Sequence, residues 1–357
     1  MKELRIGHLT INLPIIQGGM GVGISLSSLA AAVANEGGVG VISAAMIGLF
    51  EEDFVTNFLE ANIRALKKEI VKARALTKGI LGVNIMVALS NYADMVKTAV
   101  EEGIDIIFAG AGLPLNLPQF ITGKEKTKLV PIISSARAAG IISKRWHEKY
   151  DRLPDAVVVE GPMAGGHLGF KRAQLNDSNY SLEKLVPEVI NEMKQWEQLS
   201  GKSIPVIAAG GIYDGADIHK FMDIGAAGVQ MATRFVTTHE CDASEEFKNT
   251  YIRAEKEDME IIDSPVGMPG RAIGNPFISA VKEGRKHPLN CHFHCIKTCD
   301  VKNSPYCIAS ALISAQKGKM NHGFAFAGEN AYRTKEIVSV KELIQSLRQE
   351  YASARQK

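Results

Sequence analysis

One histidine in a glycine-rich setting is the clearest candidate for chemistry in this sequence. His167 lies in the run Val159-Glu-Gly-Pro-Met-Ala-Gly-Gly-His-Leu-Gly, where Gly165, Gly166 and Gly169 leave open space beside its ring. An imidazole titrates near neutral pH, so in an open site it can act as a general base. The other eight of the nine histidines lack this setting. We therefore predict His167 as the catalytic residue.

Two further clusters have the chemistry of a phosphate site. Ala208-Ala-Gly-Gly-Ile and Gly228-Val-Gln-Met-Ala-Thr-Arg-Phe each contain the end of an apolar run. Gly210 and Gly211 allow backbone N–H groups to approach a phosphate closely, and Thr233 adds a hydroxyl donor. The pattern indicates a phosphorylated ligand. By itself it leaves flavin mononucleotide (FMN) and a sugar phosphate as alternatives.

Short apolar runs alternate with longer amphipathic stretches along the chain, and the strands and helices that they predict must position these residues. Helices are expected between the runs, at 27–36, 53–76, 92–102, 135–150, 182–199 and 215–224. This alternation predicts parallel strands, and eight of them favour a closed (β/α)8 barrel with its site at the carboxyl ends of the strands. A doubly wound sheet is the competitor, but the glycines at 18–23 lack its dinucleotide spacing. The eight runs are 13–17, 39–43, 80–86, 104–109, 129–134, 156–160, 205–209 and 228–232.

Composition and charge limit the partners and the compartment that we expect for this protein. The 357 residues are 46% hydrophobic and carry a net charge of +2, so the chain has no overall electrostatic field that would attract nucleic acid or an anionic membrane. No apolar run approaches the ~20 residues of a membrane span. The N-terminal stretch lacks the pattern of a secretory signal, so we expect a cytoplasmic protein. A homo-oligomer remains an open alternative.

The alternation of apolar runs and amphipathic stretches ends after the eighth run. We expect residues 1–240 to form the barrel and residues 241–357 to form an extension packed on it, without a linker between them. In the extension the sequence predicts a charged helix at 245–259, a loop at 263–271, a helix near 308–317 and a final helix at about 339–352. This extension is a candidate for shaping a lid over the site.

Four of the five cysteines cluster in the extension. Cys291, Cys295, Cys299 and Cys307 follow a C-x3-C-x3-C-x7-C pattern, which is neither the paired spacing of zinc sites nor the ferredoxin run. Four thiolates are nevertheless able to hold zinc or an iron–sulfur cluster. The alternatives are a metal site and ordinary thiols.

The ordered motifs resemble the nitronate monooxygenase (2-nitropropane dioxygenase) family. They are Gln17-Gly-Gly-Met, Gly82-Val-Asn, Ala164-Gly-Gly-His, Ala209-Gly-Gly-Ile and Gly228-Val-Gln-Met-Ala-Thr-Arg-Phe, and they span roughly residues 10–240. The family is similar to the flavin-dependent enoyl-acyl carrier protein reductase II, and both consist of FMN-containing (β/α)8 barrels. Three positions depart from the family pattern: Met163 replaces a glutamate, Ala232 a glycine and Glu160 a glutamine.

The resemblance implies roles for particular residues. His167 matches the histidine that handles the substrate proton. The residues expected to bind FMN are Gly19, Met20, Asn84, Glu160, Gly165, Gly210, Gly211, Gln230, Met231, Ala232 and Thr233.

The implied activity is oxidation of alkyl nitronates by O2 to carbonyl compounds and nitrite. The first alternative is an NAD(P)H-dependent reductase of enoyl thioesters. The second is a flavin or metal protein that transfers electrons or senses oxidants, although a scaffold of that kind has no use for a base at His167.

Overall fold

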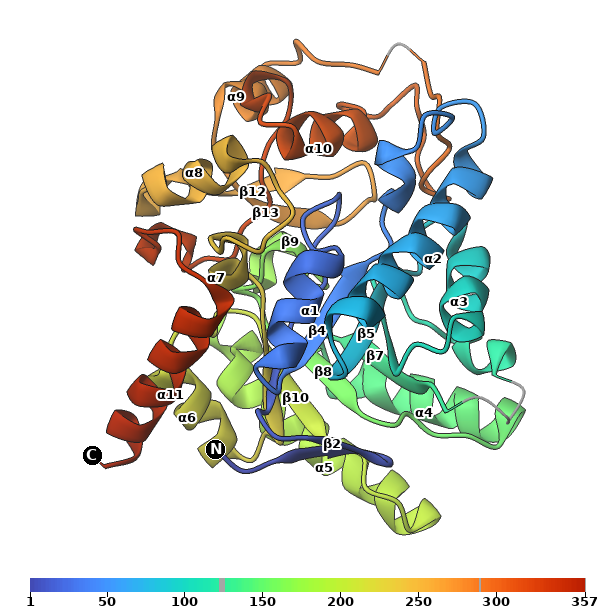
Figure 1. The fold of residues 1–357 in the computed structure, drawn as a ribbon, viewed down its shortest axis with the longest axis vertical. Coiled ribbons are helices and arrows are strands. Elements are labelled where there is room, and N and C mark those ends of the chain that lie inside the picture. Colours follow the sequence, from blue (N-terminus) through green and yellow to red (C-terminus); the bar gives the residue numbers. More distant parts are fainter. Residues whose placement is uncertain (122–125, 289, 357) are drawn as a thin grey trace.

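Eight parallel strands close into a barrel in a computed structural model that describes residues 1–121, 126–288 and 290–356 (Figure 1). Around the barrel the strands follow the order β10-β11-β3-β4-β5-β6-β7-β8. The predicted fold class is confirmed, and each predicted run overlaps one barrel strand. The strands are β3 (Ile15–Gln17), β4 (Val39–Ser43), β5 (Ile80–Met86), β6 (Ile106–Gly110), β7 (Lys128–Ile133), β8 (Val157–Glu160), β10 (Val206–Ala209) and β11 (Gly228–Met231).

The strands are buried on both faces, as their composition predicts. Val157, Val158 and Val159 of β8 are all completely buried, alternately in the layer between strands and helices and in the barrel interior. Such continuous apolar runs suit parallel strands covered by helices. The helices that follow the barrel strands are α1 (Ser27–Asn35), α2 (Phe58–Leu76), α3 (Tyr92–Glu101), α4 (Ala136–Tyr150), α5 (Leu182–Ser200), α6 (Gly215–Ile224) and the short α7 (Thr233–Val236).

The helix predicted from residue 53 begins five residues later. The carbonyl of Asp53 accepts hydrogen bonds from the N–H groups of Thr56 and Asn57, which closes turns instead of extending the helix. A hairpin of β1 (Leu4–Ile6) and β2 (Leu9–Ile11) precedes the barrel. Its apolar residues Leu4, Ile6 and Ile11 pack in one cluster with barrel-interior residues such as Ile106 and Phe108.

A small antiparallel sheet in the extension differs from the prediction. The expected helix at 245–259 ends early as α8 (Glu245–Arg253), and the expected loop at 263–271 belongs to a hairpin of β12 (Met259–Asp263) and β13 (Pro269–Ile273). The hairpin pairs with β9 (Gly166–His167), which belongs to the loop after β8. Because β9 supplies partners from a distant part of the chain, Gly270 and Arg271 gain strand pairing that local periodicity does not reveal.

The rest of the extension spans the top and the left side of the molecule in Figure 1. Its other helices are α9 (Pro276–Lys282), α10 (Ile308–Gln316) and α11 (Val340–Arg355). Helix α11 lies against α6, where the N–H of Gly215 donates to the Glu350 carboxylate. The division of the chain at residue 240 stays a prediction.

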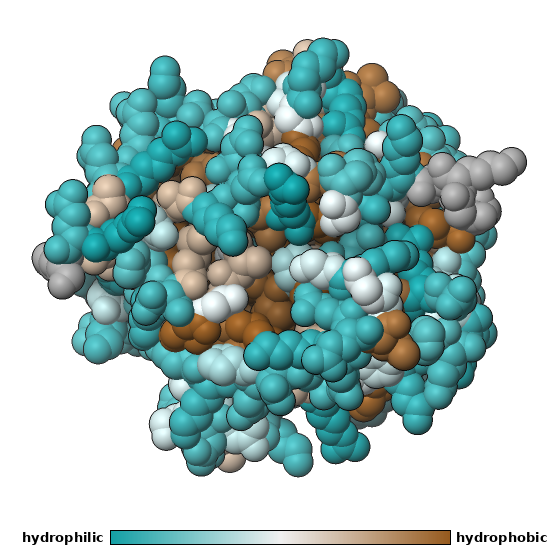
Figure 2. Space-filling model, turned by 90° about the horizontal axis from the view of Figure 1, so that it is seen from below, coloured by the Kyte–Doolittle hydropathy of each residue, from teal (hydrophilic) through white to brown (hydrophobic). Residues whose placement is uncertain are grey.

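The face seen from below in Figure 2 is mostly hydrophilic, with hydrophobic side chains gathered near its middle. None of the helices in the described residues is long and apolar enough to cross a membrane.

Candidate functional site

A cavity of about 250 Å³ lies at the carboxyl ends of the barrel strands. All twelve residues that the sequence predicts for catalysis and cofactor binding line it, although they come from five different barrel strands and the loops after them. They are Gly19, Met20, Asn84, Glu160, Gly165, His167, Gly210, Gly211, Gln230, Met231, Ala232 and Thr233. The barrel brings them together because parallel strands all end at the same face.

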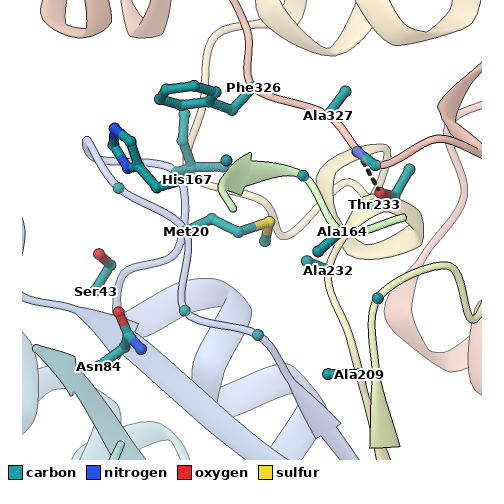
Figure 3. A pocket seen from close by; sticks show the side chains of 18 of the residues that line it. Met20, Ser43, Asn84, Ala164, His167, Ala209, Ala232, Thr233, Phe326 and Ala327 are labelled. Atoms are coloured by element: carbon teal, nitrogen blue, oxygen red, sulfur yellow. Dashed lines mark hydrogen bonds between the residues drawn. The ribbon is translucent and has the colours of Figure 1, made fainter. Parts of the chain in front are cut away.

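One side of the cavity has the properties of an anion site. Gly210 and Gly211 follow β10 with φ angles of +89° and +92°, a backbone conformation that other residues rarely adopt. Thr233 begins α7 directly after β11, and its hydroxyl oxygen accepts the N–H of Gly328 at 3.3 Å (Figure 3). Backbone amides and a hydroxyl at the ends of neighbouring strands suit a phosphate group.

The floor of the cavity offers polar side chains without protein partners. The side chains of Asn84, Glu160 and Gln230 line the cavity and make no hydrogen bond to any described residue. Gly19 allows the chain after β3 to pass close to Asn84, since a Cβ atom at position 19 would lie 2.3 Å from the Asn84 Cβ. A planar ligand with polar edges would satisfy these side chains.

Glu160 ends β8 in a setting that disfavours its charged form. Burial raises the pKa of its carboxyl group from 4.5 to about 7, and no cation offsets this effect. Among the described residues that line the cavity none is Lys, Arg or Asp. Glu160 is therefore largely protonated below neutral pH, and in that form it is a hydrogen-bond donor.

His167 lies at the opposite end of the cavity from the barrel floor, next to Phe326 (Figure 3). The two ring centroids are 5.0 Å apart, and His167 Nε2 lies 2.7 Å from the hydroxyl oxygen of Ser264. Burial lowers the pKa of His167 to about 4, so the ring is neutral at physiological pH. A neutral imidazole has one nitrogen free to accept a proton, as a general base requires.

Arg271 of β13 ties the loop after β8 to the C-terminal part of the chain. Its guanidinium is buried, donates to the carbonyls of Pro162 and Ala164 at 2.6 and 2.8 Å, and pairs with the Glu329 carboxylate at 2.7 Å. The segment 326–330 in turn reaches the phosphate side, where the Asn330 amide donates to the Gly211 carbonyl at 2.7 Å. Together these contacts hold the C-terminal segment against the side of the cavity away from the barrel.

Sequence reasoning missed the residues that the extension contributes to the cavity. They stand in segments without glycine clusters or polar strand ends, so no local signal pointed to them. They are Phe247 and Tyr251 of α8, Leu312 of α10, and Phe326, Ala327 and Gly328 of the C-terminal segment.

The predicted metal site is not borne out. All four clustered cysteines have free thiols, and within residues 1–121, 126–288 and 290–356 no three His, Cys, Asp or Glu side chains are placed to hold a metal ion. Cys295 packs in an apolar cluster with Leu89, Ile296 and Tyr306. Burial, together with the nearby thiols of the other three cysteines, raises the pKa of its thiol to about 12.

The cavity residues fit FMN. The glycine cradle and Thr233 suit its phosphate, and the unpartnered amides and carboxyl group of the floor suit the polar edge of its ring. A phosphate cradle at the ends of β10 and β11, in the same cavity as a neutral histidine, defines a cofactor-dependent (β/α)8-barrel enzyme.

Comparison with known proteins gives the family. The sequence pattern of the nitronate monooxygenase family matches residues 2–350, and the chain belongs to this family of flavin-dependent oxidoreductases. A probable nitronate monooxygenase from Staphylococcus saprophyticus is 27% identical over 303 residues, which are 78% of this chain and 80% of that protein.

A relative with a different activity is similarly close. The (3aS,4S,5R,7aS)-5-hydroxy-7a-methyl-1-oxo-octahydro-1H-indene-4-carboxyl-CoA dehydrogenase from Mycobacterium tuberculosis is 28% identical over 279 residues, 77% of this chain and 67% of that protein. The chain thus spans about two thirds of the dehydrogenase's length.

Two solved structures share the whole architecture. FabK from Thermotoga maritima is 28% identical with a TM-score of 0.74, and the match covers 97% of this chain and 94% of that one. A nitroalkane oxidase from Streptomyces ansochromogenes is 20% identical with a TM-score of 0.73, covering 97% of each chain, which shows the common fold.

Proposed function

We propose that the protein is an FMN-dependent nitronate monooxygenase that converts alkyl nitronates and O2 to carbonyl compounds and nitrite. The observation that carries this proposal is a neutral His167 above an apolar cavity whose far end is a glycine-lined anion cradle. FMN, when bound, supplies the electron transfer between substrate and O2. The phosphate would be held by the amides of Gly210 and Gly211 and by Thr233, with Asn84 and Gln230 at the ring edge.

The chain's own residues bind the substrate and move its proton. Phe247, Leu312 and Phe326 line the side of the cavity formed by the extension and favour an apolar alkyl group. When a neutral nitroalkane is bound instead, His167 would take a proton from the carbon that bears the nitro group and so form the nitronate that the reaction oxidises. The Arg271 contacts hold the segment 326–330, from which Phe326, Ala327 and Gly328 line this part of the cavity.

A second candidate is an NAD(P)H-dependent reductase of enoyl thioesters. It is favoured by the protonated carboxyl group of Glu160, which is a proton donor inside the cavity, and by the similarity to FabK and to a dehydrogenase of a CoA thioester. In this reaction His167 or Glu160 would deliver a proton to the substrate carbon next to the thioester.

The two candidates are separated by adding a nitronate and NADH to separate anaerobic samples of the purified protein. Loss of flavin absorbance with the nitronate, followed by nitrite release when O2 is admitted, supports the monooxygenase. Bleaching by NADH alone supports the reductase, and absence of flavin from the purified protein contradicts both.

The variant His167→Asn tests the role of the histidine. We expect it to keep FMN and to lose about 100- to 10,000-fold in turnover of a neutral nitroalkane, which is the usual contribution of a general base. His219→Asn is the matched control, because His219 packs against Tyr351 of α11, outside the cavity. Near-normal turnover by His167→Asn would contradict the assignment.

A further inference from the structure

Glu160 has the only carboxyl side chain among the described residues that line the cavity. Its side chain follows the alternation along β8, in which Val158 also points into the barrel interior. The interior cluster that contains Val158, Phe108 and Ala209 is apolar, and the Glu160 carboxyl group makes no hydrogen bond to any described residue. The proposed monooxygenase reaction does not use this group.

The end of β8 adjoins the phosphate side of the cavity. Glu160 is in register with Ala209 of β10, and Gly210, the first glycine of the cradle, follows Ala209. The N–H of Gly161 donates to the Ala209 carbonyl at 2.9 Å, and a Cβ atom at Gly210 would lie 2.8 Å from the Gly161 carbonyl oxygen. Ala209 also lies on the same side of the cavity as Thr233 (Figure 3). The carboxyl group and the anion cradle therefore stand at neighbouring strand ends of one cavity.

No cation in the described lining of the cavity offsets the charge of a bound phosphate. The buried guanidinium of Arg271 holds the loop after β8, but it is already paired with the Glu329 carboxylate at 2.7 Å and donates to two carbonyls. A phosphate monoester carries about two negative charges above neutral pH. Because like charges repel strongly in a buried site, a bound phosphate favours the protonated form of Glu160.

We propose that Glu160 takes up a proton when the cavity binds the phosphate group of FMN, so that the protein binds its cofactor less tightly as the pH rises. The proposal rests on the assignment of FMN in the proposed function. On binding, a proton from solvent forms an O–H bond with the Glu160 carboxylate, which removes one negative charge from the cavity. Burial raises the pKa of this carboxyl group to about 7, so above neutral pH a carboxylate is present to take up the proton.

The elements packed against β8 present no other charge to Glu160. On one side, Lys128 begins β7 at the far end of the barrel and pairs with Asp155 at 3.3 Å. On the other side, β10 consists of Val206, Ile207, Ala208 and Ala209. The buried residues of α5 are all apolar: Leu182, Leu185, Val186, Val189 and Met193.

Two other titratable residues line the cavity in the described part of the chain, Tyr251 and His167. The Tyr251 hydroxyl donates to the Phe326 carbonyl, and burial raises its pKa, so it is already protonated at neutral pH. His167 is neutral and has a nitrogen able to accept a proton, although burial lowers its pKa to about 4. The experiment must therefore separate Glu160 from His167.

The coupling predicts how the dissociation constant (Kd) for FMN depends on pH. Between about pH 7 and about pH 8.5 the phosphate is already doubly ionised, so its own titration adds little. Over this range we expect Kd to rise about 5- to 15-fold in the wild type, below the ~30-fold limit for release of one full proton. In Glu160→Gln it should change less than about twofold, and at about pH 8.5 this variant should bind FMN more tightly than the wild type.

Ultrafiltration of the purified holoenzyme at a series of dilutions separates free from bound FMN and gives Kd at each pH. His167→Asn should keep the rise of Kd with pH. Glu188→Gln, on the exposed face of α5, is the matched control and should keep it as well. Riboflavin, which has the same ring and no phosphate, should show a clearly smaller rise than FMN.

A constant Kd for FMN over this range, or a rise that persists in Glu160→Gln, would overturn the proposal. Loss of the rise in His167→Asn would place the proton on the histidine and overturn it too, and equal rises for FMN and riboflavin would remove the phosphate charge as the cause. The expected pH dependence in a protein that oxidises no nitronate would uphold this proposal and contradict the proposed function. A protein that binds no FMN would contradict both.

Discussion

Replacing Glu160 by glutamine tests the electrostatics of the cavity. Below about pH 4.5 the carboxyl group is protonated in both the folded and the unfolded chain, so it does not affect stability. Between pH 4.5 and about 7 the unfolded chain releases the proton while the folded protein retains it, and the free energy of unfolding falls. Above pH 7 both states are ionised and the loss is complete.

The size of the effect follows from the rise in pKa. A rise from 4.5 to about 7 corresponds to about 3 kcal/mol of lost stability at alkaline pH. Because the carboxyl group faces a cavity that water can enter, we expect a measured value of about 2–3 kcal/mol. Glutamine has nearly the same shape and no charge, so Glu160→Gln should lack this loss and be the more stable protein at alkaline pH.

Urea unfolding at about pH 5 and about pH 8 measures the difference. We expect the two proteins to differ little at the lower pH, where only a small part of the loss has developed, and Glu160→Gln to be clearly more stable at the higher pH, with and without added FMN. Glu188→Gln, on the exposed face of α5, is the matched control and should show no such dependence on pH. If the difference in the free energy of unfolding between the wild type and Glu160→Gln is the same at both pH values, the carboxyl group is ionised and paired in the folded protein, and the reasoning is refuted.

Two substitutions test how the cavity is built. Gly211→Asp should weaken FMN binding at least about tenfold, because it places a carboxylate near the phosphate and its Cβ would lie 2.9 Å from the Met163 Cβ. An unchanged flavin content would contradict the assignment of Gly211 to the phosphate site. Gly201→Asp, which has a positive φ at the end of α5 and open space around it, controls for backbone strain. Arg271→Met should destabilise the protein by about 3–5 kcal/mol in urea unfolding, since it leaves Glu329 and two carbonyls without their partner. Arg172→Met, which removes an exposed pair with Asp263, should change stability by less than about 1 kcal/mol, and equal effects of the two would refute the role of Arg271.

Local sequence determined the barrel and much of its site. The strands were predictable because a strand covered on both faces needs apolar side chains at successive positions, as in Val157, Val158 and Val159. The site residues were predictable because a parallel barrel gathers all strand ends at one face, so the short segment after each strand suffices to locate them. His167, Glu160, Gly211 and Thr233 were found in this way.

Only tertiary contacts determine which segments of the chain cover the site. The pairing of Gly270 with His167 and the contact of Ser264 with the same residue join segments about 100 residues apart, and a local pattern does not specify such partners. The cysteines illustrate the converse, because their clustering in sequence did not produce, among the described residues, a group of side chains placed to hold a metal ion. Cys295 instead fills an apolar cluster.

Residue spacing therefore determined which side chains stand at the ends of the barrel strands. The packing of the extension decided which of them are shielded from water, and burial in that packing, absent from the unfolded chain, keeps His167 and, up to about pH 7, Glu160 neutral.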